Sequence, residues 1–420
     1  MSLLMIIAFA VLMVLSFPVA YALTIAASVA LFATEQVPML AVVQQMFAPT
    51  QSFPMIAIPF FVMAGDLMMA GKLGQALIEF ATDLVSRFRG GHAQVSVLGS
   101  TLFGGVSGSA VADATALGSI LIPWQKKVGY PKAFCGATIA ASSTIDILIP
   151  PSIPLILYSL VSNVSIGALF YAGILPGILL AVGFLAVCNI SARLRGFPYE
   201  KKPLAWGVMG RRALYASPAL LMPVFVLLAL RFGVATPTEI STVAVVYAMI
   251  CATFIYRDLN LKRVYHAMIT AGLATGVVML LIMASSVVGW MLTLDQVPEA
   301  IVQWAKQFVH SKEAMLMLIN LVLLVAGMFL DLPAAILLLG PLLIPLANTF
   351  GIDLLQLGIV VVVNLAIGLY TPPVGTTLFI GATLAKARIG DTVKELLPFY
   401  AVALLILLSF TYIPALTLRG

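Results

Sequence analysis

Charged residues are scarce in this sequence, which has 22 Lys and Arg, 16 Asp and Glu, and 3 His among its 420 residues. The charged fraction is 9% and the hydrophobic fraction 62%, whereas soluble domains carry roughly 25% charged residues. So few charges cannot cover the surface of a water-soluble globule of this size. The composition excludes a cytosolic enzyme, a disordered chain and a nucleic-acid binder, and it predicts an integral membrane protein.

Cysteine motifs and nucleotide motifs are also missing. The three cysteines lie far apart, without a CxxC or Cys/His metal spacing, and are expected to pack as small hydrophobic residues. No P-loop, HExxH or Rossmann pattern is present. The first 33 residues have neither a charged n-region nor an A-x-A cleavage signal, so we expect a first membrane segment there rather than a removed signal peptide.

Long charge-free runs occupy most of the chain, and a membrane crossing needs about 20 apolar residues. The longest polar stretch is 193–212. Its basic residues are Arg193, Arg195, Lys201, Lys202, Arg211 and Arg212. Because Lys and Arg concentrate in cytoplasmic loops, we expect 193–212 to be a cytoplasmic loop that separates a first half, 1–192, from a second half, 213–420.

The two halves share landmarks in one register of 222 residues. Ile122-Pro123 recurs as Ile344-Pro345, Gly129 as Gly351, Pro150-Pro151 as Pro372-Pro373, and Leu175-Pro176 as Leu397-Pro398. This spacing indicates an internal duplication. The loop after the first landmark has basic residues at 126, 127 and 132, whereas its equivalent in the second half, 347–353, has none. The loop after the first proline pair, 162–165, is uncharged, whereas its equivalent contains basic residues at 386 and 388. The swap predicts an inverted repeat.

Residues 92–124 are too few for two full crossings, although basic residues flank both ends. The run Gly104–Ser109 lies at the midpoint. We therefore predict a re-entrant helical hairpin with a Gly/Ser tip, and a matching hairpin over 314–346 with its tip from Gly327 to Pro333. Irregular backbone at membrane depth requires burial in protein or contact with water.

The proline pairs lie inside long apolar segments and predict two broken helices, 133–163 and 355–384, because each proline removes an amide donor and clashes with a preceding carbonyl. The breaks expose carbonyl oxygens, which suit Na⁺, and helix N-termini, which favour a carboxylate. The simpler alternative is a proline kink. Matching pairs flanked by Ser and Thr favour a binding site.

Four acids lie in apolar surroundings: Asp66, Asp113, Asp146 and Asp331. Each costs about 2.5–3.5 kcal/mol at a helix centre and needs a partner. The last three lie near the hairpin tips and the first helix break, so we expect them to be functional, whereas Asp66 is open between a functional and a capping role. Glu239, in the run Thr236–Glu239, fits the start of a helix.

Two amphipathic stretches, 73–89 and 297–312, occupy equivalent positions before the hairpins. They are expected to lie in opposite membrane interfaces and to brace a moving unit, or to be surface helices without a mechanical role. Gly105–Gly108 also matches the GxSG of intramembrane serine proteases. The three histidines lie close to predicted membrane edges, so a base for Ser107 is lacking and hydrolysis is a remote alternative.

Together these motifs resemble the large membrane subunit of tripartite ATP-independent periplasmic (TRAP) transporters, the DctM family, over essentially the whole chain. The runs that carry the resemblance are Ile58–Gly65, Gly104–Asp113, Ile149–Ser152, Thr236–Glu239 and Thr371–Gly375. The resemblance implies a multi-pass secondary carrier of the bacterial inner membrane with scaffold and transport regions and an elevator motion. It also implies Na⁺-coupled uptake of an organic acid, a periplasmic substrate-binding protein and a separate small subunit of four helices.

By position, the family's Na⁺-site residues correspond to Ser107, Ser109, Asp146, Ile149 and Pro151 in the first half. A second set corresponds to Gly327, Asp331, Gly368, Thr371 and Pro373. The candidates for binding substrate are Asp113, Ser152, Asp331 and Thr376. The resemblance leaves open which carboxylate is carried, and a self-sufficient Na⁺/anion symporter of the same fold remains the alternative.

Overall fold

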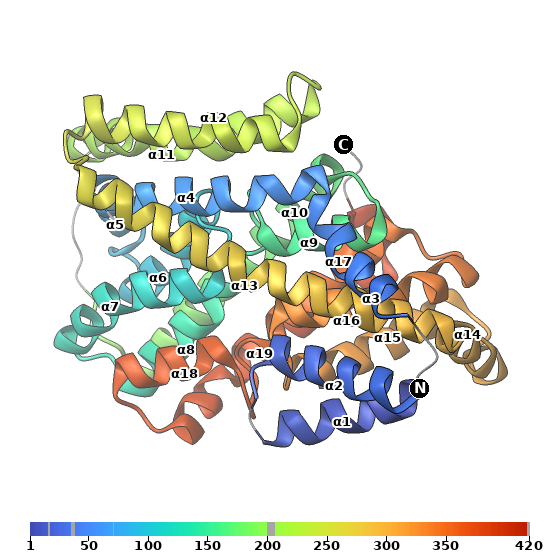
Figure 1. Ribbon diagram of the computed structural model, residues 1–420. Coiled ribbons are helices and arrows are strands. Elements are labelled where there is room, and N and C mark those ends of the chain that lie inside the picture. The colour runs from blue at the N-terminus through green and yellow to red at the C-terminus, as the bar shows by residue number, and fades with distance from the viewer. Residues whose placement is uncertain (16, 35–37, 70, 200–205, 418–420) are drawn as a thin grey trace.

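The computed structural model describes the chain except residues 16, 35–37, 70, 200–205 and 418–420. Every regular element within the described residues is a helix (Figure 1), which confirms the predicted all-α class. In the part of the chain that the structure describes, six helices are long and apolar enough to cross a membrane, and a further pair, bent by 60°, makes up to seven. Part of the predicted basic loop, 200–205, lies outside the described residues.

The helices divide between the two halves of the sequence. The first comprises α1 (Ser2–Val14), α2 (Val19–Thr34), α3 (Met39–Phe47), α4 (Ala57–Met69), α5 (Lys72–Val85), α6 (Gly91–Gly104), α7 (Ala110–Val128), α8 (Lys132–Ser142), α9 (Ile153–Ser162) and α10 (Ile166–Arg195). The second comprises α11 (Trp206–Arg231), α12 (Pro237–Ile250), α13 (Leu261–Leu294), α14 (Val297–Phe308), α15 (Lys312–Gly327), α16 (Leu332–Thr349), α17 (Leu354–Gly368), α18 (Thr376–Ala385) and α19 (Ile389–Tyr412). Short 3-10 turns, η1 (Ala48–Gln51) and η2 (Phe53–Ile56), join α3 to α4.

Two helical hairpins and two interrupted helices occupy matching places in the two halves. The α6–α7 and α15–α16 pairs lie where the sequence predicts hairpins. The α8–α9 and α17–α18 pairs are separated by 143–152 and 369–375, where the proline pairs lie. The peptide bond inside each pair, Pro150-Pro151 and Pro372-Pro373, is cis. The starts of α7 and α8 each precede those of α16 and α17 by 222 residues.

The interrupted helices pack against each other across the two halves. Helix α8 lies on α18 (Figure 1) and α9 contacts α17. Glycines allow the first crossing, because a Cβ at Gly136 would lie 2.8 Å from the carbonyl oxygen of Gly381. The buried hydroxyl of Thr377 donates to the Ala140 carbonyl at 3.0 Å. The first arm of one interrupted helix therefore pairs with the second arm of the other.

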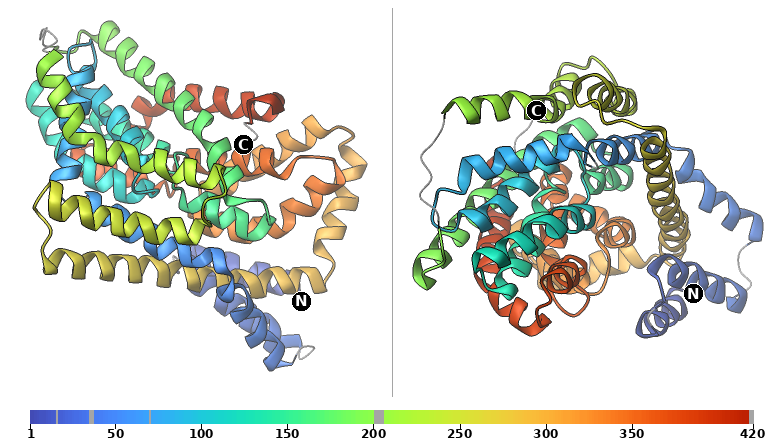
Figure 2. Two further views of the ribbon diagram at one scale, coloured as in Figure 1. Left: turned by 90° about the horizontal axis from the view of Figure 1, so that it is seen from above. Right: turned by 90° about the vertical axis from the view of Figure 1, so that its left-hand side faces the viewer.

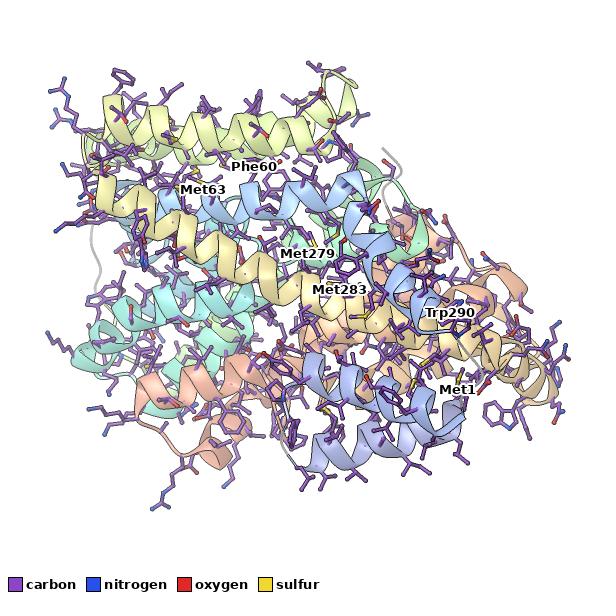
Figure 3. The ribbon with its side chains drawn as sticks, viewed as in Figure 1. Met1, Phe60, Met63, Met279, Met283 and Trp290 are labelled. Atoms are coloured by element: carbon purple, nitrogen blue, oxygen red, sulfur yellow. The ribbon has the colours of Figure 1, made fainter. Side chains whose placement is uncertain are left out.

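Helix α13 is the longest in the described structure, with 34 residues, and extends along one side of the molecule (Figure 2). It packs against α2, α3, α4 and α16. Met279, Met283 and Trp290 follow one another along α13, and Phe60 and Met63 lie on the neighbouring α4 (Figure 3).

A hydrogen-bonded junction joins the α4–α5 turn to the α12–α13 turn. Asp258 accepts from the backbone amide of Lys72 at 2.7 Å and pairs with Arg263 at 2.9 Å. Arg263 also donates to the carbonyl oxygen of Leu67 at 3.3 Å. Burial raises the pKa of Asp258, but these hydrogen bonds and positive charges outweigh it and hold that pKa below its usual value. The junction ties the two turns together.

The start of α12 has the geometry predicted for Thr236–Glu239. The side chain of Thr236 accepts from the Glu239 amide, and the Glu239 carboxylate accepts from the Thr236 amide at 2.7 Å. This capping box satisfies two amides at the helix start, which confirms the structural role expected for Glu239.

Candidate functional site

The tip of the first hairpin contacts the first helix break. The backbone amide of Gly108 donates to the Asp146 carboxylate at 3.3 Å, and the Ser107 side chain and Ser109 amide lie close to the same carboxylate. A Cβ at Gly104 would lie 3.0 Å from the Cα of Asp146. The glycines of the tip therefore let its backbone reach the break directly.

Two fully buried carboxylates lie together at this contact. Asp113, in the first turn of α7, is beside Asp146 and the Ser100 hydroxyl. Both oxygens of Asp113 and Oδ2 of Asp146 lack a hydrogen-bond partner among the described residues. Buried acceptors without partners are costly, and two neighbouring carboxylates repel each other if both are ionised. A cation or a proton between them would relieve both penalties.

Ser152 stabilises the break rather than facing open space. Its hydroxyl donates to the Ile147 carbonyl at 2.5 Å and accepts from the Leu155 amide at 3.3 Å, so it caps the start of α9. Ile149 and Pro151 lie inside the break, and the carbonyl oxygen of Pro151 packs closely on Gly108. The break thus brings backbone oxygens to the hairpin tip.

The second hairpin meets the second break in a related way. The amide of Val374 donates to the Met328 carbonyl at 3.1 Å. A Cβ at Gly368 would lie 2.5 Å from the carbonyl oxygen of Gly327. Thr371 is half-buried and donates to the Ile367 carbonyl at 2.6 Å. Pro373 is exposed. This contact has backbone oxygens and one hydroxyl, but no carboxylate pair like that of the first half.

A cavity of about 290 Å³ lies between the two hairpin tips. Its lining includes the N-termini of α7, α9 and α16, a residue of the second break, Leu369, and the middle of α13. Three helix N-termini give the cavity a positive electrostatic character, which favours an anion. The residues that line it are Gly108, Ser109, Ala110, Val111, Ile147, Ile153, Pro154, Ala274, Val277, Val278, Asp331, Leu332, Pro333 and Leu369.

Of the four residues expected to bind substrate, Asp331 alone is found in this lining. Asp113 is fully buried beside Asp146, and Ser152 caps α9. The Thr376 hydroxyl is buried at the start of α18 without a partner among the described residues. The structure thus places Asp113 with the first candidate cation site, and it gives Ser152 a capping role.

Sequence reasoning missed two contributions to the site. The face of α13 at Ala274, Val277 and Val278 lines the cavity, but small apolar residues carry no chemical signal in a sequence. Gly65 of α4 packs on the first hairpin tip, since a Cβ there would lie 2.7 Å from the carbonyl oxygen of Val106. A glycine inside a helical segment could have suggested a close approach. Asp66 is half-buried on α4 and lies outside the cavity lining.

Comparison with known families decides the identity of the chain. The family model of the tripartite ATP-independent periplasmic transporter, DctM component, matches residues 6–416. The chain belongs to the DctM family. This DctM chain is therefore a multi-pass membrane transporter permease and not an enzyme. In the hydrolase alternative, His92 could not act as the base for Ser107, because it lies about 18 Å along α6 from the helix end that precedes Ser107.

Relatives cover nearly the whole DctM chain. A protein of Sinorhizobium fredii called uncharacterized protein y4mL is 52% identical over 91% of this chain and 91% of its own length. The C4-dicarboxylate TRAP transporter large permease protein DctM of Pseudomonas aeruginosa is 37% identical over 89% of this chain and 87% of its own. The solved structure of the Alcanivorax borkumensis YdaH transporter has a TM-score of 0.62 at 16% identity, covering 88% and 86% of the two chains, which supports the fold.

Proposed function

We propose that this chain is the large permease subunit of a TRAP system that carries an organic acid inward together with Na⁺. The observation that carries the proposal is the cavity between two hairpin tips, each of which contacts an interrupted helix. Such breaks provide helix N-termini for an anion and free carbonyl oxygens for Na⁺ in one place. The C4-dicarboxylate relative supports an organic acid as the substrate class.

The first cation site would use Ser107, Ser109, Asp146 and the backbone oxygens at Ile149 and Pro151. The unpartnered oxygens of Asp146 and its neighbour Asp113 fit this assignment, because Na⁺ prefers hard oxygen ligands. We therefore add Asp113 to the residues that hold this ion, as a second negative charge. A bound Na⁺ would relieve the repulsion within the carboxylate pair and join the hairpin tip to the helix break.

The second cation site would use Gly327, Asp331, Gly368, Thr371 and Pro373. The close packing of Gly368 on Gly327 brings the ends of α15 and α17 together. Its ligands would be mostly backbone oxygens, so this site would carry less negative charge than the first.

The inverted repeat and an elevator motion complete the proposal. The crossed packing of the interrupted helices supports two halves of opposite orientation. Helices α5 and α14 stand between scaffold helices and hairpins, and Arg212 of α11 pairs with Asp83 of α5 at 2.6 Å. The hairpins and interrupted helices would move as a unit, with α5 and α14 as arms that lie along the two membrane surfaces.

The family works with a small membrane subunit and a periplasmic binding protein. For this chain we propose a separate four-helix subunit and a binding protein that delivers the acid, with all membrane parts in a bacterial inner membrane. A self-sufficient symporter of the same fold remains the second candidate, and the role of the binding protein separates the two.

Reconstitution in proteoliposomes tests this function. The chain with its small subunit and binding protein should accumulate the acid that the binding protein recognises only under an inward Na⁺ gradient. Unchanged uptake without Na⁺, or with a proton gradient alone, would contradict Na⁺ coupling. Full uptake when the binding protein is left out would favour the self-sufficient symporter.

A further inference from the structure

The cavity contains a charge of unexpected sign. Among the described residues that line it, Asp331 is the one ionisable side chain, and it is exposed to the cavity space. The remaining lining is apolar apart from Ser109 and the backbone of Gly108. The three helix N-termini can attract a substrate carboxylate, but a second carboxylate repels it. If the cavity binds a substrate acid, the carboxylate of Asp331 therefore needs a group that offsets this repulsion.

The position of Asp331 leaves its side chain free to meet such a partner. Asp331 is the N-cap of α16, where an aspartate ordinarily accepts from the amide two or three residues later. Pro333 has no amide to offer, and the Asp331 side chain does not bond the next amide, that of Ala334, either. Its counterpart 222 residues earlier, Ser109, does cap its helix and accepts from the Ala112 amide at 3.5 Å.

No described residue supplies Asp331 with a hydrogen bond or an ion pair through its side chain. A carboxylate at a cavity wall accepts hydrogen bonds and donates none while it is ionised. The groups that satisfy it best are hydroxyl and ammonium donors. A site built to bond a substrate hydroxyl discriminates strongly against an analogue that lacks it.

We infer that Asp331 accepts a hydrogen bond from the substrate, and that the substrate is a hydroxy or amino acid rather than a plain carboxylate. Its carboxylate would lie toward the N-termini of α7 and α9, and its donor group toward α16. A cavity of about 290 Å³ has room for a small molecule, about ten water-sized groups at roughly 30 Å³ each. The inference rests on the proposed function and adds the substrate class.

A role for Asp331 as a Na⁺ ligand alone makes a different prediction. Loss of its charge would then weaken the binding of every acid equally and raise the Na⁺ concentration needed. If Asp331 instead bonds the substrate, loss of its charge weakens donor-bearing acids selectively. Pairs of acids that differ in one donor or a few donors separate these two roles.

The test measures ligand-induced thermal stabilisation of the purified full chain in Na⁺ buffer. The probes are four pairs: glycerate and propionate, malate and succinate, gluconate and hexanoate, glutamate and glutarate. Wild type, Asp331→Asn and the control Glu239→Gln are compared. The control makes the same acid-to-amide change at a capping box that an amide side chain also satisfies.

In at least one pair, wild type should bind the donor-bearing acid about tenfold or more tightly, as expected for a hydrogen bond to a charged group. Asp331→Asn should reduce that ratio toward one, beyond any loss of binding that both members of the pair share, and Glu239→Gln should retain the ratio. Equal binding within every pair of acids would overturn the inference. So would a binding ratio that survives in Asp331→Asn, or an equal loss of binding for both members of each pair together with a shifted Na⁺ midpoint. If Na⁺ and all eight acids leave wild type unchanged, the proposed function falls as well.

Discussion

The backbone amide of Gly108 donates to the carboxylate of Asp146 at 3.3 Å and so joins the first hairpin tip to the first helix break. The second oxygen of this carboxylate, and both oxygens of the neighbouring Asp113, are left without partners among the described residues. The same contact therefore holds the tip in place and presents unsatisfied oxygens. A cation bound to these oxygens, as we propose, would stabilise the contact between tip and break.

The carboxylate pair should dominate Na⁺ binding at the first site. We expect Asp146→Asn and Asp113→Asn each to raise the Na⁺ midpoint of thermal stabilisation about tenfold or more, because a charged ligand is lost. Asp83→Asn is the matched control, since Asp83 pairs with Arg212 away from the site. If both site variants keep the wild-type Na⁺ midpoint, neither carboxylate is a ligand of the cation.

Gly65 should be intolerant of a side chain. A methyl group there would lie 2.7 Å from the carbonyl oxygen of Val106 and 3.2 Å from the Cα of Ser107, so Gly65→Ala should move the hairpin tip. Overpacking of this kind costs about 1–3 kcal/mol, and thermal unfolding in detergent would measure the loss. Gly272→Ala on α13 is the control, because its methyl group meets open space. Equal stability of the two variants would speak against a tight contact.

The hydroxyl of Thr377 should stabilise the packing between the two halves. Its single proton lies within reach of the carbonyl oxygens of Ala140 at 3.0 Å and Leu369 at 2.9 Å, from a fully buried position. Thr377→Ala should lower the free energy of unfolding by about 0.5–1.5 kcal/mol, since it removes a buried hydrogen bond. Thr377→Ser keeps the hydroxyl and should restore most of the loss. If Thr377→Ala and Thr377→Ser are equally destabilised, the effect comes from loss of the Thr377 methyl group and not from loss of its hydroxyl.

The Asp258 junction should give stability a defined pH dependence. Hydrogen bonds from Lys72 and Arg263 outweigh the burial that raises the pKa of Asp258, so the folded pKa lies below the ordinary 3.8. The stabilisation is then complete above about pH 4 and is lost as the pH falls through the folded pKa.

Thermal unfolding of wild type and Asp258→Asn across this pH range measures the effect. The variant should be less stable at pH 7 by about 1–3 kcal/mol, and the difference should shrink in acid below about pH 4. A difference that is constant with pH would mean that the carboxylate charge does not contribute.

The helix breaks could be predicted from sequence because proline acts locally. Pro150-Pro151 and Pro372-Pro373 remove amide donors wherever the chain places them, and both pairs lie in interruptions between short helices. The all-helical class follows in the same way from composition. These inferences need no knowledge of which helices pack together.

The composition of the cavity could not be predicted, because it depends on packing between distant segments. Val277 and Val278 look like any other apolar residues of a membrane helix, yet they face two hairpin tips. Ser152 and Asp331 both precede a helix with a proline two residues later, but Ser152 caps its helix through the Leu155 amide and Asp331 makes no capping hydrogen bond. The sequence motif does not reveal this difference.

The central claim is that Na⁺ binds at both pairs of hairpin tip and helix break, and Na⁺-dependent uptake by Ser107→Ala and Thr371→Ala tests it most directly. In proteoliposomes with the partner proteins, each variant should insert normally but need a higher Na⁺ concentration for half-maximal uptake than wild type. A Na⁺ dependence identical to wild type in both variants would contradict the account.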